Sequence, residues 1–201
     1  MSKSPLTPDG VLADIGYSGF VRSLFNRSGD LSKDLAHALL GIATEAHELN
    51  RAEDRVHGIE ELGDLEFYGE AALQVIEEAI GLPLDRAELE FAVDDISSLL
   101  CDDYSAADAI ADGVNDLLDV AKRWVGYGKA PADFLQLSRD VAGLVRFINA
   151  QSAYYEPDLA KIRRTNVAKL MKRYEGIVFN ADRAVNRDTG AERKLLEQHA
   201  A

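Results

Sequence analysis

Two closely spaced pairs of acidic residues are the features of this sequence most able to do chemistry. Glu45 and Glu48 stand three residues apart, and Glu61 and Asp64 repeat that spacing after a short polar segment. Residues three or four positions apart lie on one face of an α-helix, so each pair would project from a single face. Carboxylates gathered in this way are the ligands that hard divalent cations prefer.

Apolar residues stand beside both pairs at helical spacing. Glu45 lies in line with Ile42 and Leu49, and Glu61 lies in line with Leu65. The acidic side chains therefore lean toward the packed side of their helices. Such placement is costly, because buried carboxylates lose solvation and repel one another.

Two arrangements would relieve this cost. The carboxyl groups could keep their protons through raised pKa values, or a divalent cation could bind between them. If the two helices form an antiparallel hairpin, the pairs face each other and form an all-oxygen cage suited to Mg²⁺ or Mn²⁺. Acidic pairs on helices also commonly face solvent without a ligand, but two pairs on apolar stripes favour the cation.

Helices must position these residues, because no run of the sequence alternates as a strand does, and the expected class is all-α. Ser32 is expected to cap the first acidic helix, and a break from Asp54 to Gly58 should precede the second. We expect helices over residues 11–26, 32–52, 59–81, 85–100, 105–124, 134–151 and 157–174. The remainder should be an extended tail with a short helix over residues 192–198.

Composition and charge exclude several classes of protein. The chain has 201 residues, 47% of them hydrophobic, and a formal net charge of -13. A nucleic-acid binder needs a basic face, so no nucleic-acid partner is expected. Cys101 is the only cysteine, which gives no sign of a disulfide-containing secreted protein. Without an apolar run that could span a membrane or serve as a signal segment, a cytoplasmic protein with no membrane partner is expected.

A weak internal repeat links the two halves of the chain. HALLGIATEAHEL from His37 is similar to SAADAIADGVNDL from Ser105, and IEELGDLEFYG from Ile59 is similar to SRDVAGLVRFI from Ser138. Most apolar positions agree, but half of the carboxylates are lost. The four acidic positions become Gly113, Asp116, Asp140 and Gly143. We expect a first copy over residues 1–103 with the intact motif and a second, degenerate copy over residues 104–201.

The motifs resemble those of MazG-like all-α nucleoside triphosphate pyrophosphohydrolases. The metal motif of that family, ExxE followed after a short gap by ExxD, reads here as EAHE from Glu45 and ELGD from Glu61. The stretch NVAKLMKRYEGIVFNADRAVNRD resembles the segment that phage and bacterial members carry after the metal helices. The resemblance covers residues 17 to 195.

The resemblance implies a hydrolase that cleaves a (deoxy)nucleoside triphosphate to the monophosphate and pyrophosphate. It assigns Mg²⁺, or Mn²⁺, to Glu45, Glu48, Glu61 and Asp64, with Glu60 as an outer-shell base. Water activation and charge neutralisation on the triphosphate are what such ions supply.

The same resemblance assigns substrate binding to the C-terminal segment. Lys169 and Arg173, four residues apart, would meet phosphates, Asn166 would touch the base or sugar, and Tyr174 belongs to the same motif. An ordinary solvated basic face is an equally open interpretation, because further lysines and arginines are neighbours.

Family members usually carry one motif set per chain and assemble as dimers or tetramers. The tandem arrangement here therefore implies a fused pseudo-dimer of the kind seen in dimeric all-α dUTPases, and a homodimer is expected by analogy. The alternative function is a non-catalytic helical scaffold or nucleotide sensor, suggested by the decayed second copy. A zinc site is not favoured, because the histidines lack paired spacing with each other or with cysteine.

Overall fold

The computed structural model describes residues 6–91, 106–174 and 177–200, and within these ranges every regular element is a helix. This confirms the all-α class. The helices are α1 (Pro8–Leu24), α2 (Leu31–Leu49), α3 (Arg55–Ile80), α4 (Arg86–Phe91), α6 (Ala106–Tyr127), α7 (Phe134–Gln151), α8 (Leu159–Arg173), α9 (Ala181–Val185) and α10 (Thr189–Ala200).

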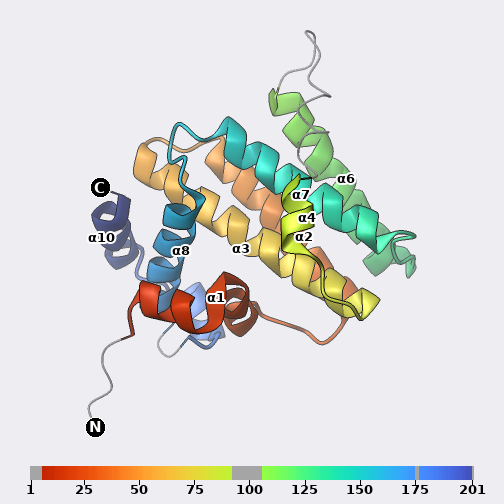
Figure 1. Cartoon of the computed structure of the whole chain (residues 1–201), viewed down its shortest axis with the longest axis horizontal. Coiled ribbons are helices and arrows are strands. Elements are labelled where there is room, and N and C mark those ends of the chain that lie inside the picture. Colours follow the sequence, from red (N-terminus) through yellow and green to blue (C-terminus); the bar gives the residue numbers. More distant parts are fainter. Residues whose placement is uncertain (1–5, 92–105, 175–176, 201) are drawn as a thin grey trace.

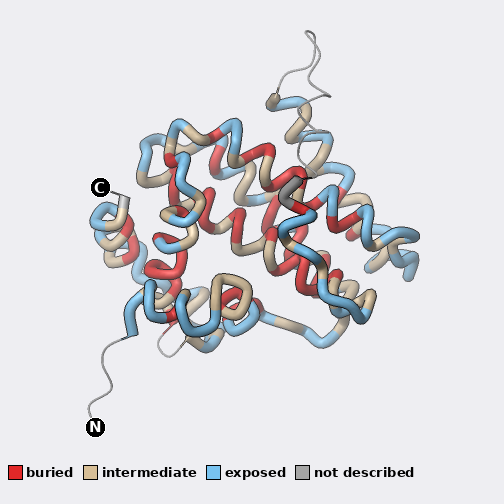
Figure 2. Tube along the Cα trace, in the orientation of Figure 1, coloured by how far each residue is buried: buried red, intermediate tan, exposed pale blue. Residues whose placement is uncertain are grey.

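Two helix pairs form the centre of the molecule. Helix α3 runs through the middle, packed against α2 and α7, while α6 packs against α2 and α7 (Figure 1). Their facing sides are buried and apolar, as the red stretches in Figure 2 show. The largest fully buried side chains of α2 and α3 include Leu35, Leu39, Ile42, Leu62, Leu65 and Ile76. This core fixes α2 beside α3, as the acidic motifs require.

A second apolar cluster fastens α8 at one end of α3. Phe20 and Leu24 of α1 pack with Val167 and Leu170 of α8, and Tyr174 completes the buried set. Helices α1 and α10 flank α8 in the same region (Figure 1). Segments from both ends of the chain are thereby brought to the acidic helices.

Several predicted boundaries were wrong by a few residues. Asp30, not Ser32, caps α2, because its carboxylate accepts a hydrogen bond of 3.0 Å from the Ser32 backbone amide. Asp54 caps α3 through the His57 amide at 2.9 Å, so Gly58 lies inside the helix and not in a break. Aspartate and serine are both favoured N-cap residues, so sequence spacing alone does not decide whether Asp30 or Ser32 caps α2.

The predicted extended tail was also wrong in part. Residues 181–185 form α9 and residues 189–200 form α10, which packs against α8 and α3. Leu196 is almost fully buried and anchors α10. The tail is therefore largely helical and packs against the other helices.

The predicted repeat corresponds to the helix pairs α2–α3 and α6–α7, which lie against each other. Residues 92–100 of the expected fourth helix, Cys101, the expected Ser105 cap and the boundary between residues 103 and 104 lie outside the described ranges. Among the helices that are described, none has both the length and the apolarity to cross a membrane.

Candidate metal centre

Three of the four predicted ligands converge between α2 and α3. Glu45, Glu61 and Asp64 each offer a carboxylate oxygen, and these oxygens lie within 4.8 Å of one another. Glu48 is exposed one turn along α2 and lines the same pocket. The antiparallel hairpin therefore brings the two motifs to one place, as their spacing predicted.

Burial raises the pKa of two of these groups. Burial, followed by the nearby charge of Asp64, raises the pKa of Glu45 to about 9. Burial also raises the pKa of Glu61, although a hydrogen bond from Glu45 partly opposes the rise. The Glu45 carboxyl, with its raised pKa, therefore holds its proton more tightly than a solvated glutamate does. A divalent cation at this point would replace that proton and relieve the repulsion.

Asp64 is held from behind by two residues of α8. Asn166 donates a hydrogen bond of 2.7 Å to one carboxylate oxygen, and the Lys169 ammonium binds the other. Lys169 is fully buried, and its Nζ also lies 3.3 Å from Glu60. Burial alone would lower the pKa of Lys169, but the charges of Asp64 and Glu60 raise it overall, so the side chain stays charged.

A close approach of α8 to α3 makes these contacts possible. A Cβ atom at Gly63 would lie 2.9 Å from the Asn166 Cβ, so only glycine permits this separation. Asn166 and Lys169, which were expected to contact substrate, instead contact Asp64 and do not line the pocket. Their contacts fix the orientation of the Asp64 carboxylate.

Arg173 and Tyr174 lie on the pocket side of the same segment. The guanidinium of Arg173 lines the pocket and forms two hydrogen bonds to the Glu192 carboxylate, at 2.9 and 2.7 Å. Burial would lower the pKa of Arg173, but these bonds raise it, so the guanidinium remains charged. Tyr174 is buried and packs on Phe179 with ring centroids 5.8 Å apart.

The carboxylates open into a pocket of about 380 Å³. Aromatic side chains also line it: Phe25 stacks on His37 at 4.8 Å, and Phe67 meets Tyr68 edge to face at 5.5 Å. A pocket of this size lined by both carboxylates and aromatic rings fits a ligand that is partly planar and partly cation-bound.

Sequence reasoning missed several residues of this pocket. Phe25 ends α1, and Phe179, Ala184 and Arg187 come from the tail that was expected to be extended. In the sequence, only the aromatic or basic character of these residues hinted at a role. Their spacing did not indicate that the tail packs beside α2.

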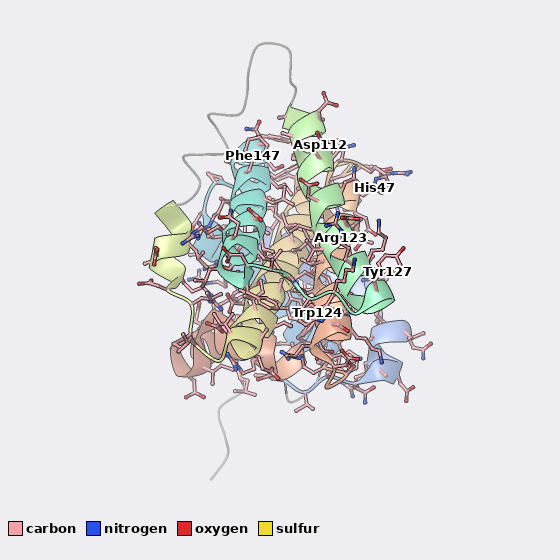
Figure 3. The ribbon with its side chains drawn as sticks, turned by 90° about the vertical axis from the view of Figure 1, so that its right-hand side faces the viewer. His47, Asp112, Arg123, Trp124, Tyr127 and Phe147 are labelled. Atoms are coloured by element: carbon pink, nitrogen blue, oxygen red, sulfur yellow. The ribbon has the colours of Figure 1, made fainter. Side chains whose placement is uncertain are left out.

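Among the described residues, the group of side chains that could hold a metal ion includes no histidine. His57 Nε2 lies 3.1 Å from Glu61, and its Nδ1 accepts a hydrogen bond of 3.4 Å from the Glu53 backbone amide. His47 of α2 lies beside α6 (Figure 3) and lines a different pocket together with residues of that helix.

The donor set fits a hard cation. Ligands are carboxylate oxygens from two rigid helices, and Mg²⁺ and Mn²⁺ favour such oxygens while keeping waters for exchange with substrate. A mutual separation of up to 4.8 Å requires only a small inward movement to reach ligand distances.

No protein-family model matches this chain, and comparisons with curated proteins and with solved structures gave no match either. The MazG-like likeness therefore rests on the motifs quoted above.

Proposed function

We propose that this protein hydrolyses a (deoxy)nucleoside triphosphate to the monophosphate and pyrophosphate with Mg²⁺ as cofactor. One observation carries the proposal: Glu45, Glu61 and Asp64 meet at a pocket that aromatic side chains also line. Such a pocket suits a ligand with a planar base and a cation-bound polyphosphate.

The residues have distinct roles in this proposal. Glu45, Glu48, Glu61 and Asp64 would hold the cation, which when bound polarises phosphate oxygens and lowers the pKa of water. Glu60 lines the pocket from α3 and would accept a proton from the attacking water. The water oxygen forms a new bond to phosphorus, the bridge between the α and β phosphates breaks, and pyrophosphate leaves.

The contacts behind Asp64 support a site that has to keep its geometry. Lys169 and Asn166 fix the orientation of this carboxylate, and ligand carboxylates are commonly held by such hydrogen bonds. Arg173, held by Glu192, would face the substrate phosphates.

The relation between the two halves is part of the same proposal. Helices α2 and α3 supply the carboxylates, while α8 of the second half supplies Asn166, Lys169 and Arg173, as a fused pseudo-dimer would require. A homodimer is proposed from the family resemblance and would be tested by sedimentation velocity.

The deciding experiment is pyrophosphate release from a panel of dNTPs and NTPs with Mg²⁺, repeated with EDTA. Release from at least one nucleotide, lost in EDTA, is expected. If no nucleotide in the panel is hydrolysed while Mg²⁺ and nucleotide still bind, the alternative of a nucleotide sensor holds; if neither binds, the scaffold alternative holds.

A further inference from the structure

A smaller hollow of about 170 Å³ adjoins the carboxylate pocket. Arg173 and Arg187 line both spaces and form the boundary between them. The hollow lies where the end of α8 meets the tail, between α9 and the start of α10. We call this space the basic hollow. Its charged lining residues are Lys172, Arg173, Arg183, Arg187, Asp188 and Glu192.

The charge of the basic hollow is opposite to that of the chain. Four cationic side chains face two carboxylates there, whereas the protein as a whole carries a net charge of -13. Basic residues gathered in one concave place, beside a pocket lined by carboxylates, favour an anion that extends across both. A polyphosphate has that form, because one end binds cations held by carboxylates and the other meets arginines.

Most of the charged groups in the basic hollow already have partners. Arg173 is bound to Glu192, Arg183 donates to the Arg173 carbonyl oxygen at 3.5 Å, and Asp188 accepts the Ala191 amide at 3.0 Å. Arg187 is exposed and makes no hydrogen bond or ion pair within the described part of the chain. It is therefore the cation at the boundary that is available to a ligand.

We propose that the basic hollow is a pyrophosphate-binding subsite and that Arg187 is its principal contact. It would hold the terminal phosphates of a nucleoside triphosphate and then the pyrophosphate that leaves. The identity of the substrate rests on the proposed function, but the affinity for pyrophosphate rests only on the cations that surround the basic hollow.

Calorimetric titration of the full chain with inorganic pyrophosphate, in EDTA at low salt, tests this assignment without any turnover. Arg187→Ala should weaken pyrophosphate binding by about tenfold, as expected when a charge-assisted hydrogen bond is lost. Arg187→Lys should restore part of the affinity. Lys194→Ala is the matched control, because it removes the same charge from an exposed position of α10 that lines neither space; its affinity should change by less than about twofold.

A wild-type chain that binds no pyrophosphate, or an Arg187→Ala variant that binds it as the Lys194→Ala variant does, overturns the subsite. Circular dichroism of both variants checks the fold. The proposed function is judged separately, by dNTP hydrolysis. If pyrophosphate binds through Arg187 but no nucleotide is hydrolysed, the proposed function is overturned and the subsite is kept. If nucleotides are hydrolysed but Arg187→Ala binds pyrophosphate as tightly as the wild type does, the subsite is overturned and the proposed function is kept.

Discussion

The side-chain amide of Asn166 lies 2.7 Å from the Asp64 carboxylate, although the two residues are 102 positions apart in the chain. This contact, with that of Lys169, makes α8 the support of a carboxylate on α3. The orientation of Asp64 therefore depends on the packing of the second half against the first. Loss of that packing should disturb the proposed metal centre before it disturbs α2 and α3 themselves.

Lys169→Met should destabilise the fold, because it leaves Asp64 and Glu60 without their buried counter-charge. We expect a loss of roughly 3 kcal/mol in the free energy of unfolding, measured with urea in EDTA. Saturating Mg²⁺ should reduce this loss, since the cation also neutralises Asp64. Lys172→Met, at an exposed position of the same helix, should change stability by less than about 0.5 kcal/mol. Equal stabilities of the two variants would contradict the supporting role of Lys169.

The convergence of the acidic pairs could be predicted because helical periodicity fixes which side chains share a face. Ile42 and Leu49 are buried, and Glu45 beside them points to the same side. The role of Lys169 could not be predicted in this way. Its sequence neighbours are basic and partly exposed, and only the close approach of α8 at Gly63 places it against a carboxylate instead of a phosphate.

The stability of the metal-free protein should fall as pH rises through the neutral range. The pKa of Glu45 rises from its ordinary 4.5 to about 9 on folding, so the folded state binds this proton more tightly than the unfolded state. A group of this kind stabilises the fold below pH 4.5, and the contribution is lost as pH increases toward 9. Urea unfolding at pH 6 and pH 8.5 in EDTA measures the loss.

Glu45→Gln provides the control for that pH dependence. The neutral amide cannot ionise, so the stability of this variant should change less between pH 6 and pH 8.5 than that of the wild type. In saturating Mg²⁺ the wild type should show the opposite trend, because metal binding requires deprotonated carboxylates. A wild-type stability in EDTA that rises over this range would contradict the raised pKa.

Glu48→Gln should reduce dNTP hydrolysis by at least about 100-fold while leaving the helical circular dichroism intact. Glu48 is exposed, so the loss of its charge removes a ligand without leaving a buried partner behind. Asp64→Asn should have the same effect on hydrolysis, but it also deprives Lys169 of its counter-charge. Asp140→Asn is the control, because Asp140 holds the place of Glu61 in the second copy, is exposed on α7 and does not line the pocket. Full activity in Glu48→Gln would remove Glu48 from the metal site.

The aromatic lining of the pocket could not be predicted from the sequence. Phe25 and Phe179 lie 154 positions apart, and both line the pocket only because α1 and the tail pack around α8. Glycine and asparagine near residue 180 indicated an extended segment, but Asn180 caps α9 through the Arg183 amide at 3.0 Å. A capping residue and a loop residue have the same appearance in a sequence, since both use short polar side chains.

Gly41→Ala should weaken both the fold and the proposed metal centre. A Cβ atom at Gly41 would lie 2.3 Å from the ring of Tyr68, so α2 would have to move away from α3 or the ring would have to leave the pocket wall. We expect a loss of about 1–3 kcal/mol in the free energy of unfolding. Because Glu45 stands one turn further along α2, the same movement would separate it from Glu61 and Asp64, and the affinity for Mg²⁺ should fall as well. Helix propensity alone predicts the opposite, a gain from replacing glycine by alanine.

Gly126→Ala separates these two effects. Gly126 is exposed in α6, and nothing lies within 4 Å of where its Cβ atom would be. This substitution should raise stability by up to about 1 kcal/mol and leave Mg²⁺ binding unchanged. If Gly41→Ala behaves as Gly126→Ala does in urea unfolding and in Mg²⁺ titration, the close packing of α2 on Tyr68 is not what holds the carboxylates together.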